Sequence, residues 1–258
     1  MNNTQNVQRR TKKTLENRLS LGEQKQSLIY GPVSSRRFGT TIGISLIPLK
    51  VCSFDCVFCE LSVHTNVLTL ERHTYVSVNE VLKELRNFPT QGVDYIALSG
   101  AGEPTLAANM GEVIDALHQK YSVPVLVLSN GSTVFMKDVQ EELRKADAVK
   151  LTFSSLKEES FKRLNQPAEG VTASKVARGI EEFASSYAGT LYFEVVVVKG
   201  INDELSEVRK TVEFLAQFKP YHIDINRPVR PGTARYLELP DKELYMPLER
   251  EFPAVRVF

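Results

Sequence analysis

Cysteine, tryptophan and long apolar runs are scarce or missing in this sequence. The 258 residues include three cysteines and no tryptophan. An odd number of thiols, with no secretory signal opening the chain, does not support a disulfide framework. The longest apolar run, around residues 195–198, is far too short to span a bilayer. We therefore expect a cytoplasmic protein with no membrane partner.

An excess of charge of either sign is also missing. The chain has 32 basic and 31 acidic residues, so no overall field attracts it to nucleic acid, and an RNA partner would need a local basic patch. One basic stretch opens the sequence, with Arg9, Arg10, Lys12, Lys13 and Arg18. We expect residues 1–28 to form a polar, basic, poorly ordered extension and residues 29–258 to form one domain.

All three cysteines fall within eight positions, as Cys52, Cys56 and Cys59. Three thiolates on a cubane of four irons leave one iron without a protein ligand, and an open coordination position is typical of a reactive metal site. A zinc site with His64 as fourth ligand is the alternative, but its spacing matches none of the common zinc motifs. We therefore favour an iron-sulfur cluster.

Apolar β-like runs alternate with helical periodicity from residue 41 onward. The expected strands cover residues 42–46, 95–98, 125–128, 149–153, 191–198 and 222–225. Capping boxes are predicted at Ser77 with Glu80 and at Ser155 with Glu158. A last helical pattern near residues 244–252 contains Pro247, which would kink or restart it. Right-handed crossovers make such strands parallel, in an open doubly wound sheet or a barrel.

The cysteine spacing, with Phe58 just before the last cysteine, resembles the radical SAM superfamily. The resemblance implies an α/β fold, a partial (β/α)6 TIM-like barrel. It implies one [4Fe-4S] cluster on Cys52, Cys56 and Cys59, with S-adenosyl-L-methionine (SAM) chelated to the open iron. An electron from the cluster would cleave SAM to methionine and a 5'-deoxyadenosyl radical, which abstracts a hydrogen from a substrate. A reducing partner such as flavodoxin or ferredoxin is expected.

The same resemblance suggests how SAM is held. Gly100, Gly102 and Glu103 follow the second expected strand and would contact the methionine amine, because glycines permit close approach and a carboxylate can pair with an ammonium group. A helix start rich in small residues is the alternative for this loop. Further along the chain, Asn130 and Ser154 would hydrogen-bond the ribose. The adenine contacts would come from Phe58 and Val198.

Residues 31–39, 48–50, 99–106, 198–203 and 226–231 resemble the wyosine-synthase-like branch of iron-sulfur oxidoreductases. The tRNA 4-demethylwyosine synthase of that branch uses additional N-terminal cysteines for a second cluster, and this chain has none, so we do not expect it to make demethylwyosine. Another RNA-modifying reaction is the alternative among enzymes, and it predicts that the basic N-terminal arm contacts phosphate. A non-catalytic metal-binding or electron-transfer protein would need a saturated cluster and no SAM site.

Four arginines lie in loops expected to flank the first strand or to follow the sixth, namely Arg36, Arg37, Arg227 and Arg230. A planar guanidinium suits bidentate capture of a carboxylate or phosphate. If the barrel is nearly closed, these loops could meet at its mouth and bind an anionic substrate. Surface ion pairs are the alternative role of these arginines.

Overall fold

The computed structural model describes residues 27–61, 64–230 and 237–258. In that part of the chain, a large sheet has the spatial order β1 (Ile29–Ser35), β2 (Gly39–Ile44), β5 (Tyr95–Leu98), β6 (Val125–Ser129), β7 (Ala148–Thr152), β8 (Thr190–Val196), β9 (His222–Asn226) and β10 (Val255–Val257). Neighbouring strands are parallel except β1, which is antiparallel to β2. No described residues pair β1 with β10. The sheet therefore forms a partial barrel, as predicted.

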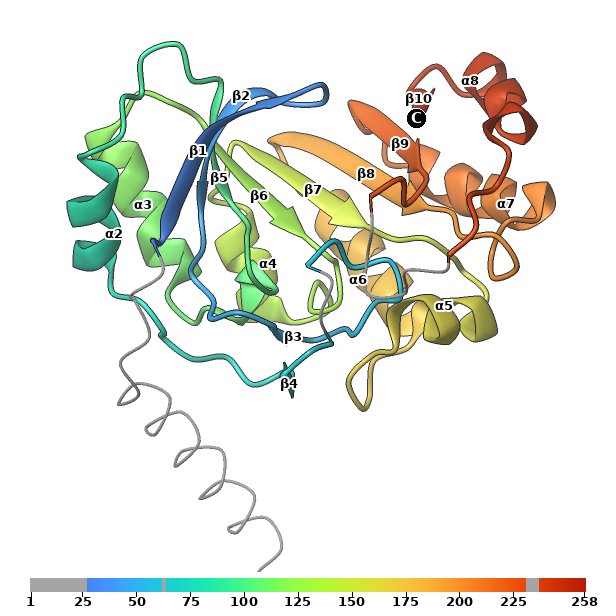
Figure 1. The fold of residues 1–258 in the computed structure, drawn as a ribbon, viewed down its shortest axis with the longest axis horizontal. Helices are drawn as coiled ribbons and strands as arrows, with labels where there is room; N and C mark the ends of the chain where they lie inside the picture. Colours follow the sequence, from blue (N-terminus) through green and yellow to red (C-terminus); the bar gives the residue numbers. More distant parts are fainter. Residues whose placement is uncertain (1–26, 62–63, 231–236) are drawn as a thin grey trace, which may run out of the picture.

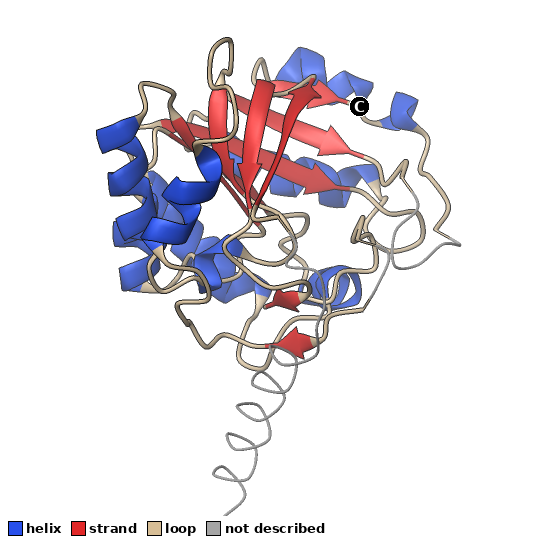
Figure 2. Ribbon diagram, turned by 60° about the vertical axis from the view of Figure 1, so that its left-hand side comes forward, coloured by secondary structure: helices blue, strands red, loops and turns tan. Residues whose placement is uncertain are grey.

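Helices cover the outer face of the curved sheet (Figures 1 and 2). They are α2 (Val78–Leu85), α3 (Met110–Lys120), α4 (Lys137–Leu143), α5 (Glu158–Asn165), α6 (Ala173–Ala184), α7 (Leu205–Ala216) and α8 (Met246–Glu251), with short 3-10 turns η1 (Pro104–Leu106) and η2 (Lys242–Leu244). The short parallel strands β3 (Val51–Cys52) and β4 (Val67–Leu68) lie apart from the large sheet, below it in Figure 1.

The two faces of the sheet bury different side chains because successive residues of a strand point in opposite directions. The main core contains Ile96, Leu98, Val125, Val127 and Val149 together with apolar side chains of the helices. Residues that alternate with these form a smaller cluster, Phe38, Ala97, Leu126, Ala148 and Tyr192. The concave face therefore keeps only a thin apolar layer, which leaves room for a cavity.

The six predicted strands are confirmed as β2 and β5 to β9. Four further strands were not predicted: in the large sheet β1, which contains Gly31 and Pro32, and the three-residue β10, and apart from it the two-residue strands β3 and β4. Prolines and glycines are depleted in strands, so the pattern of β1 is weak. Pro247 lies in the first turn of α8, where a proline's missing N–H costs no helical hydrogen bond.

Of the two predicted capping boxes, one is confirmed and one is wrong. Ser77 and Glu80 form the box at the start of α2. At α5 the N-cap is Lys157, not Ser155. The Ser155 hydroxyl instead donates to Glu207, and Glu158 Oε2 accepts from the backbone N–H of Ala173, 2.8 Å away, at the start of α6. The Glu158 carboxylate thus accepts from the start of α6 and does not cap α5.

The predicted N-terminal extension, with its basic arm, lies outside the described residues except for Ser27 and Leu28. The carbonyl of Leu28 accepts a hydrogen bond from the backbone N–H of Ser45 at 2.8 Å. Within the described ranges, no helix is both long and apolar enough to cross a membrane.

Candidate active site

Cys52 ends the short strand β3, and Cys56 and Cys59 lie on the loop that follows it, which is fastened to the end of α5. The backbone N–H groups of Asp55 and Val57 donate to the carbonyls of Asn165 (2.9 Å) and Leu164 (3.0 Å). A turn then brings Cys59 back toward Cys56, with the Cys59 N–H donating to the Cys56 carbonyl at 3.1 Å. The loop is thus held by backbone hydrogen bonds, which leaves the thiols available as ligands.

The environment of the thiols fits an iron-sulfur cluster. Burial, and then the nearby Glu103, raise the pKa of Cys52 to about 11. Burial, followed by Cys52 and Cys59, raises the pKa of Cys56 well above its ordinary value. Thiolates placed in this buried loop require a cationic group beside them.

A single metal ion fits this loop less well. In the part of the chain that the structure describes, no three His, Cys, Asp or Glu side chains converge on one ion. His64, the fourth ligand of the alternative zinc site, has its Nδ1 2.9 Å from Asp55 Oδ2. A cubane binds each thiolate at a different iron, so its ligands need not meet at one point. This geometry favours the cluster over zinc.

The glycine-rich loop after β5 packs directly on the cysteine loop. The Lys50 N–H donates to the Ala101 carbonyl (2.7 Å), and the Glu103 N–H donates to the Val51 carbonyl (3.2 Å). A Cβ on Gly102 would lie 2.0 Å from the Val51 carbonyl oxygen. Gly100 has a φ of +116°, and a Cβ there would lie 2.8 Å from Ser45 Oγ. Both glycines are therefore required for the two loops to meet.

Glu103 is a buried carboxylate, 1% exposed, that accepts several hydrogen bonds. Its donors are the Thr105 N–H (3.1 Å) and hydroxyl (2.7 Å), the Ser129 hydroxyl (2.8 Å) and the Asn130 N–H (2.8 Å). Burial raises the pKa of Glu103, and these hydrogen bonds oppose the rise. In the described residues no Lys, Arg or His forms an ion pair with it, so this buried carboxylate has hydrogen-bond donors but no cationic partner.

Asn130 and Ser154, predicted to bind ribose, occupy different environments. The Asn130 side-chain amide donates to Cys52 Sγ (3.5 Å) and Ser53 Oγ (3.2 Å), which places it beside the cysteine loop. The Ser154 hydroxyl accepts from the Val196 N–H at 3.0 Å, and its carbonyl accepts from the Asn202 side chain at 3.0 Å. Ser154 therefore links the ends of β7 and β8.

The two predicted adenine contacts lie in one apolar cluster. Val198 is buried with Leu164 and Val196, and Phe58 packs against the three of them. The cluster joins the cysteine loop to the end of β8.

The four arginines all line one cavity of about 1920 Å³, together with Ser99 and Gly100 of the glycine-rich loop. Arg36 and Arg37 follow β1 rather than preceding the first strand, because the unpredicted β1 pairs with β2 and places them in the hairpin turn. Arg36 and Arg227 still come together, since the Arg36 guanidinium lies 5.6 Å from the Phe258 ring centroid and Arg227 Nε donates to the Phe258 carbonyl at 3.0 Å.

The other two arginines pair with carboxylates. Arg230 contacts Glu60, next to Cys59, at 2.8 Å, and both side chains are largely exposed. Arg37 pairs with the buried Glu194. Of the arginines in the cavity wall, Arg230 thus belongs to an exposed ion pair with Glu60 and Arg37 to a pair with the buried Glu194.

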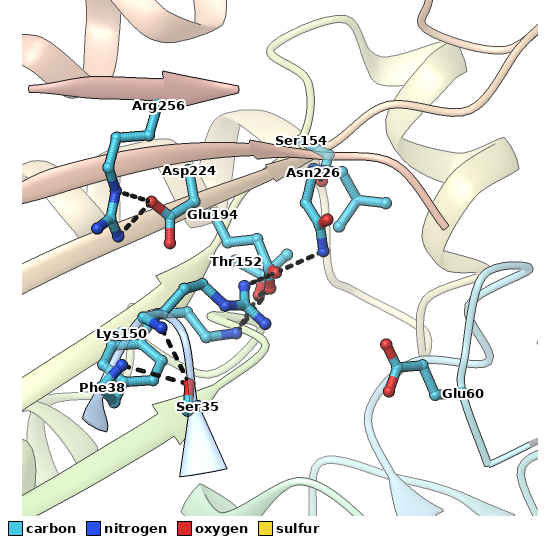
Figure 3. A network of polar contacts seen from close by, with 12 residues as sticks. Ser35, Phe38, Glu60, Lys150, Thr152, Ser154, Glu194, Asp224, Asn226 and Arg256 are labelled. Carbon is cyan, nitrogen blue, oxygen red and sulfur yellow. Dashed lines mark hydrogen bonds and ion pairs between the residues drawn. The ribbon is translucent and has the colours of Figure 1, made fainter. Parts of the chain in front are cut away.

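Glu194 is the centre of a polar network on the concave face (Figure 3). Besides Arg37, it accepts hydrogen bonds from Lys150 (2.9 Å), Thr152 (3.1 Å) and Asn226 (3.2 Å). Burial opposes its ionisation, but Lys150 and Arg37 outweigh burial and hold the pKa of Glu194 well below its ordinary value. Glu60 stands apart from this network in Figure 3. Sequence reasoning missed the network because its members are single polar residues on separate strands.

Residues 46–215 match the family model described as the Radical SAM superfamily. The chain belongs to the radical SAM superfamily. The cofactors of these enzymes are a [4Fe-4S] cluster and SAM, which agrees with the thiol set and with the buried carboxylate. A UPF0026 protein of Synechocystis is 35% identical over 204 residues, which cover 79% of this chain and 76% of that relative. A UPF0026 protein of Methanocaldococcus jannaschii is 29% identical over 222 residues, 84% of this chain and 68% of the relative.

Solved structures agree on the fold. The SAM-bound structure of Streptococcus suis SuiB aligns over 84% of this radical SAM chain with a TM-score of 0.63 and 15% identity. The chain spans about half of SuiB's length, 49% of it. At this identity the likeness concerns the fold alone.

Proposed function

We propose that this chain binds one [4Fe-4S] cluster through Cys52, Cys56 and Cys59 and cleaves SAM reductively to abstract a hydrogen from an anionic substrate. The observation that carries the proposal is the packing of the cysteine loop on the glycine-rich loop at the wall of a large cavity. Ligands for the cluster, a carboxylate for the methionine amine and space for a substrate thus lie together.

When bound, the cluster would supply the electron that cleaves SAM to methionine and a 5'-deoxyadenosyl radical. The chain's own residues bind and orient. Glu103 offers its buried carboxylate to the ammonium group of SAM, and the Gly100–Gly102 backbone permits close approach. Asn130, whose side-chain amide donates to Cys52 Sγ, would hydrogen-bond the ribose, and the apolar cluster of Phe58 and Val198 would contact the adenine.

The cavity wall supports an anionic substrate. In the described residues no carboxylate side chain pairs with Arg36 or Arg227, and Arg227 donates to the backbone oxygens of Phe258 (3.0 Å) and Pro240 (3.2 Å). The exposed Arg230–Glu60 pair contributes about 1 kcal/mol at most, and an anionic ligand can replace its carboxylate. Arg37 is held by Glu194 and shapes the wall. An anion beside the cysteine loop would therefore meet Arg36, Arg227 and Arg230.

We also infer that residues 29–258 form one catalytic domain in the wyosine-synthase-like branch, with residues 1–28 as an extension. The quoted stretches that resemble this branch support the inference. The basic N-terminal arm on which the second substrate class, RNA, depends lies outside the described residues.

Anaerobic reconstitution tests the cluster. The full chain should take up about four irons, and Cys52→Ala, Cys56→Ala and Cys59→Ala should each lose the cluster. Leu61→Ala, an exposed change in the same loop, is the matched control and should keep it. With dithionite, the loaded protein should release 5'-deoxyadenosine and methionine from SAM. Stoichiometric zinc, or about eight irons, would contradict the assignment.

The substrate is sought by comparing metabolites and RNA nucleosides in cells with and without the protein. With the substrate identified, Arg230→Lys should reduce its turnover more than uncoupled SAM cleavage, because lysine keeps the charge but loses the bidentate fork. Equal loss of both activities would place Arg230 outside the substrate site.

A further inference from the structure

Lys50 is a buried cation placed against a cluster ligand. It is 2% exposed, and its Nζ lies 3.2 Å from Cys59 Sγ. In the described part of the chain, no carboxylate forms an ion pair with it. Sequence reasoning did not select Lys50, because a lone lysine between two apolar residues is usually a surface residue.

The backbone holds Lys50 in this position. Its φ of +59° is in the left-handed region, which non-glycine residues rarely adopt. Its N–H donates to Ala101, and its carbonyl accepts from the N–H groups of Asn66 (2.9 Å) and Val67 (3.1 Å). The unusual conformation is therefore imposed by the glycine-rich loop on one side and the loop leading into β4 on the other.

The charge of Lys50 lies beside the thiol set. Its ammonium group hydrogen-bonds Cys59 Sγ directly, in the same loop as Cys52 and Cys56. A buried cation needs an anionic partner, and thiolates on a cluster provide one. Hydrogen bonds to the sulfurs and the net charge around a cluster set its reduction potential.

We infer that Lys50 is a positioning residue that orients Cys59 and raises the reduction potential of the cluster. The inference rests on the proposed function, since it needs a cluster on these cysteines. One-electron reduction, with the electron supplied by an external reductant, adds negative charge to the cluster. A fixed ammonium group at a ligand sulfur stabilises that reduced state more than the oxidised state. The lysine thus makes the cluster easier to reduce.

Redox titration of the reconstituted full chain, followed by electron paramagnetic resonance, tests this inference. The variants are Lys50→Met, Lys50→Gln and Lys50→Arg. At the midpoint potential of the unaltered protein, Lys50→Met should lower the reduced-to-oxidised ratio about tenfold, equivalent to about 59 mV for a one-electron couple. Lys50→Gln should also lower this ratio, whereas Lys50→Arg, which keeps the positive charge, should leave it close to that of the unaltered protein. Lys199→Met, which removes an exposed lysine paired with Glu238, is the control and should leave the ratio unchanged.

Other results would overturn the inference. A full iron complement with an unchanged midpoint in Lys50→Met would make the lysine a packing residue only. An unchanged midpoint with weaker SAM binding would assign Lys50 to the carboxylate of SAM. If Lys50→Met holds no iron, the test passes to the other two variants. Equal midpoint potentials in Lys50→Gln and Lys50→Arg would then overturn the inference. Loss of iron from a folded Lys50→Arg would overturn it as well. A chain that takes up no cluster before any substitution would instead contradict the proposed function.

Discussion

The side-chain amide of Asn130 donates a hydrogen bond to Cys52 Sγ at 3.5 Å. The backbone N–H of the same residue donates to Glu103 Oε2 at 2.8 Å. One residue therefore connects the proposed cluster ligands with the carboxylate proposed for SAM. This arrangement makes Asn130 a sensitive position for both cofactors.

Asn130→Asp should weaken cluster retention. It replaces an N–H donor at Cys52 with a carboxylate, and hydrogen bonds to charged groups contribute about 1.5 to 3 kcal/mol. Iron loss to a competing chelator should be faster than in the unaltered protein. Asn66→Asp, whose side chain contacts only the Leu49 carbonyl in the described residues, is the control. Equal rates in both variants would separate Asn130 from the cluster.

Glu103→Gln should lower the affinity for SAM without loss of iron. The substitution removes the charge that would pair with the ammonium group, worth about 1.5 to 3 kcal/mol, or about 10- to 100-fold in the dissociation constant. Equilibrium binding of SAM to the reconstituted protein measures the change. Glu182→Gln alters an exposed carboxylate on α6 and should bind SAM normally. Unchanged affinity in Glu103→Gln would remove Glu103 from the site.

Gly102→Ala should destabilise the contact between the two loops. Its Cβ would lie 2.0 Å from a backbone oxygen that has no freedom to move aside, so we expect a loss of about 1 to 3 kcal/mol in the free energy of unfolding and a lower iron content. Gly92→Ala is the matched control because it has open space but a φ of +75°. It should lose stability through backbone conformation alone and keep its iron. Normal iron in Gly102→Ala would show that the loops can separate.

Glu194 should make stability depend on pH in the acidic range. Lys150 and Arg37 overcome the effect of burial and hold its pKa below the ordinary value of 4.5. At a pH between the lowered pKa of the folded protein and the ordinary pKa of 4.5, the unfolded chain binds more protons than the folded protein. The stabilisation is therefore complete above about pH 4.5 and is lost as the pH falls toward the folded pKa. Glu194→Gln leaves two cations without a partner and should cost about 3 kcal/mol at pH 7.

Denaturant unfolding at a series of pH values checks this prediction. The difference in unfolding free energy between the unaltered protein and Glu194→Gln should shrink from about pH 5 to about pH 3. A difference that stays constant over this range would show that Glu194 does not titrate with folding.

The sequence predicts the parallel strands well because their apolar runs are strong and regularly spaced. It also identifies the cysteine and glycine-rich loops, since thiol spacing and glycines carry chemical meaning over a few residues. It misses β1, whose pattern is interrupted by Gly31 and Pro32, and so misplaces Arg36 and Arg37 relative to the first strand. These features depend on pairing between segments rather than on any local pattern.

Side-chain partners across the barrel are the other limit. Lys50 and Glu194 look ordinary in the sequence, and their roles appear only when Cys59 and Arg37 are brought beside them. The Ser155 capping box fails for the same reason, because Glu207 and the start of α6 compete for its two side chains. Local propensity cannot report such competition between distant elements.

The Arg37–Glu194 pair joins the hairpin turn before β2 to β8, across the three strands β5, β6 and β7 that separate them in the sheet. A twisted sheet has several ways to curl, and backbone hydrogen bonds between neighbours do not choose its final radius. An ion pair between strands that are not neighbours restricts how far the sheet can curl. Together with the edge contact between the Phe38 and Tyr192 rings, this ion pair helps to set the distance between the hairpin turn and β8. A shorter residue at position 37 would therefore change the shape of the cavity without altering any strand.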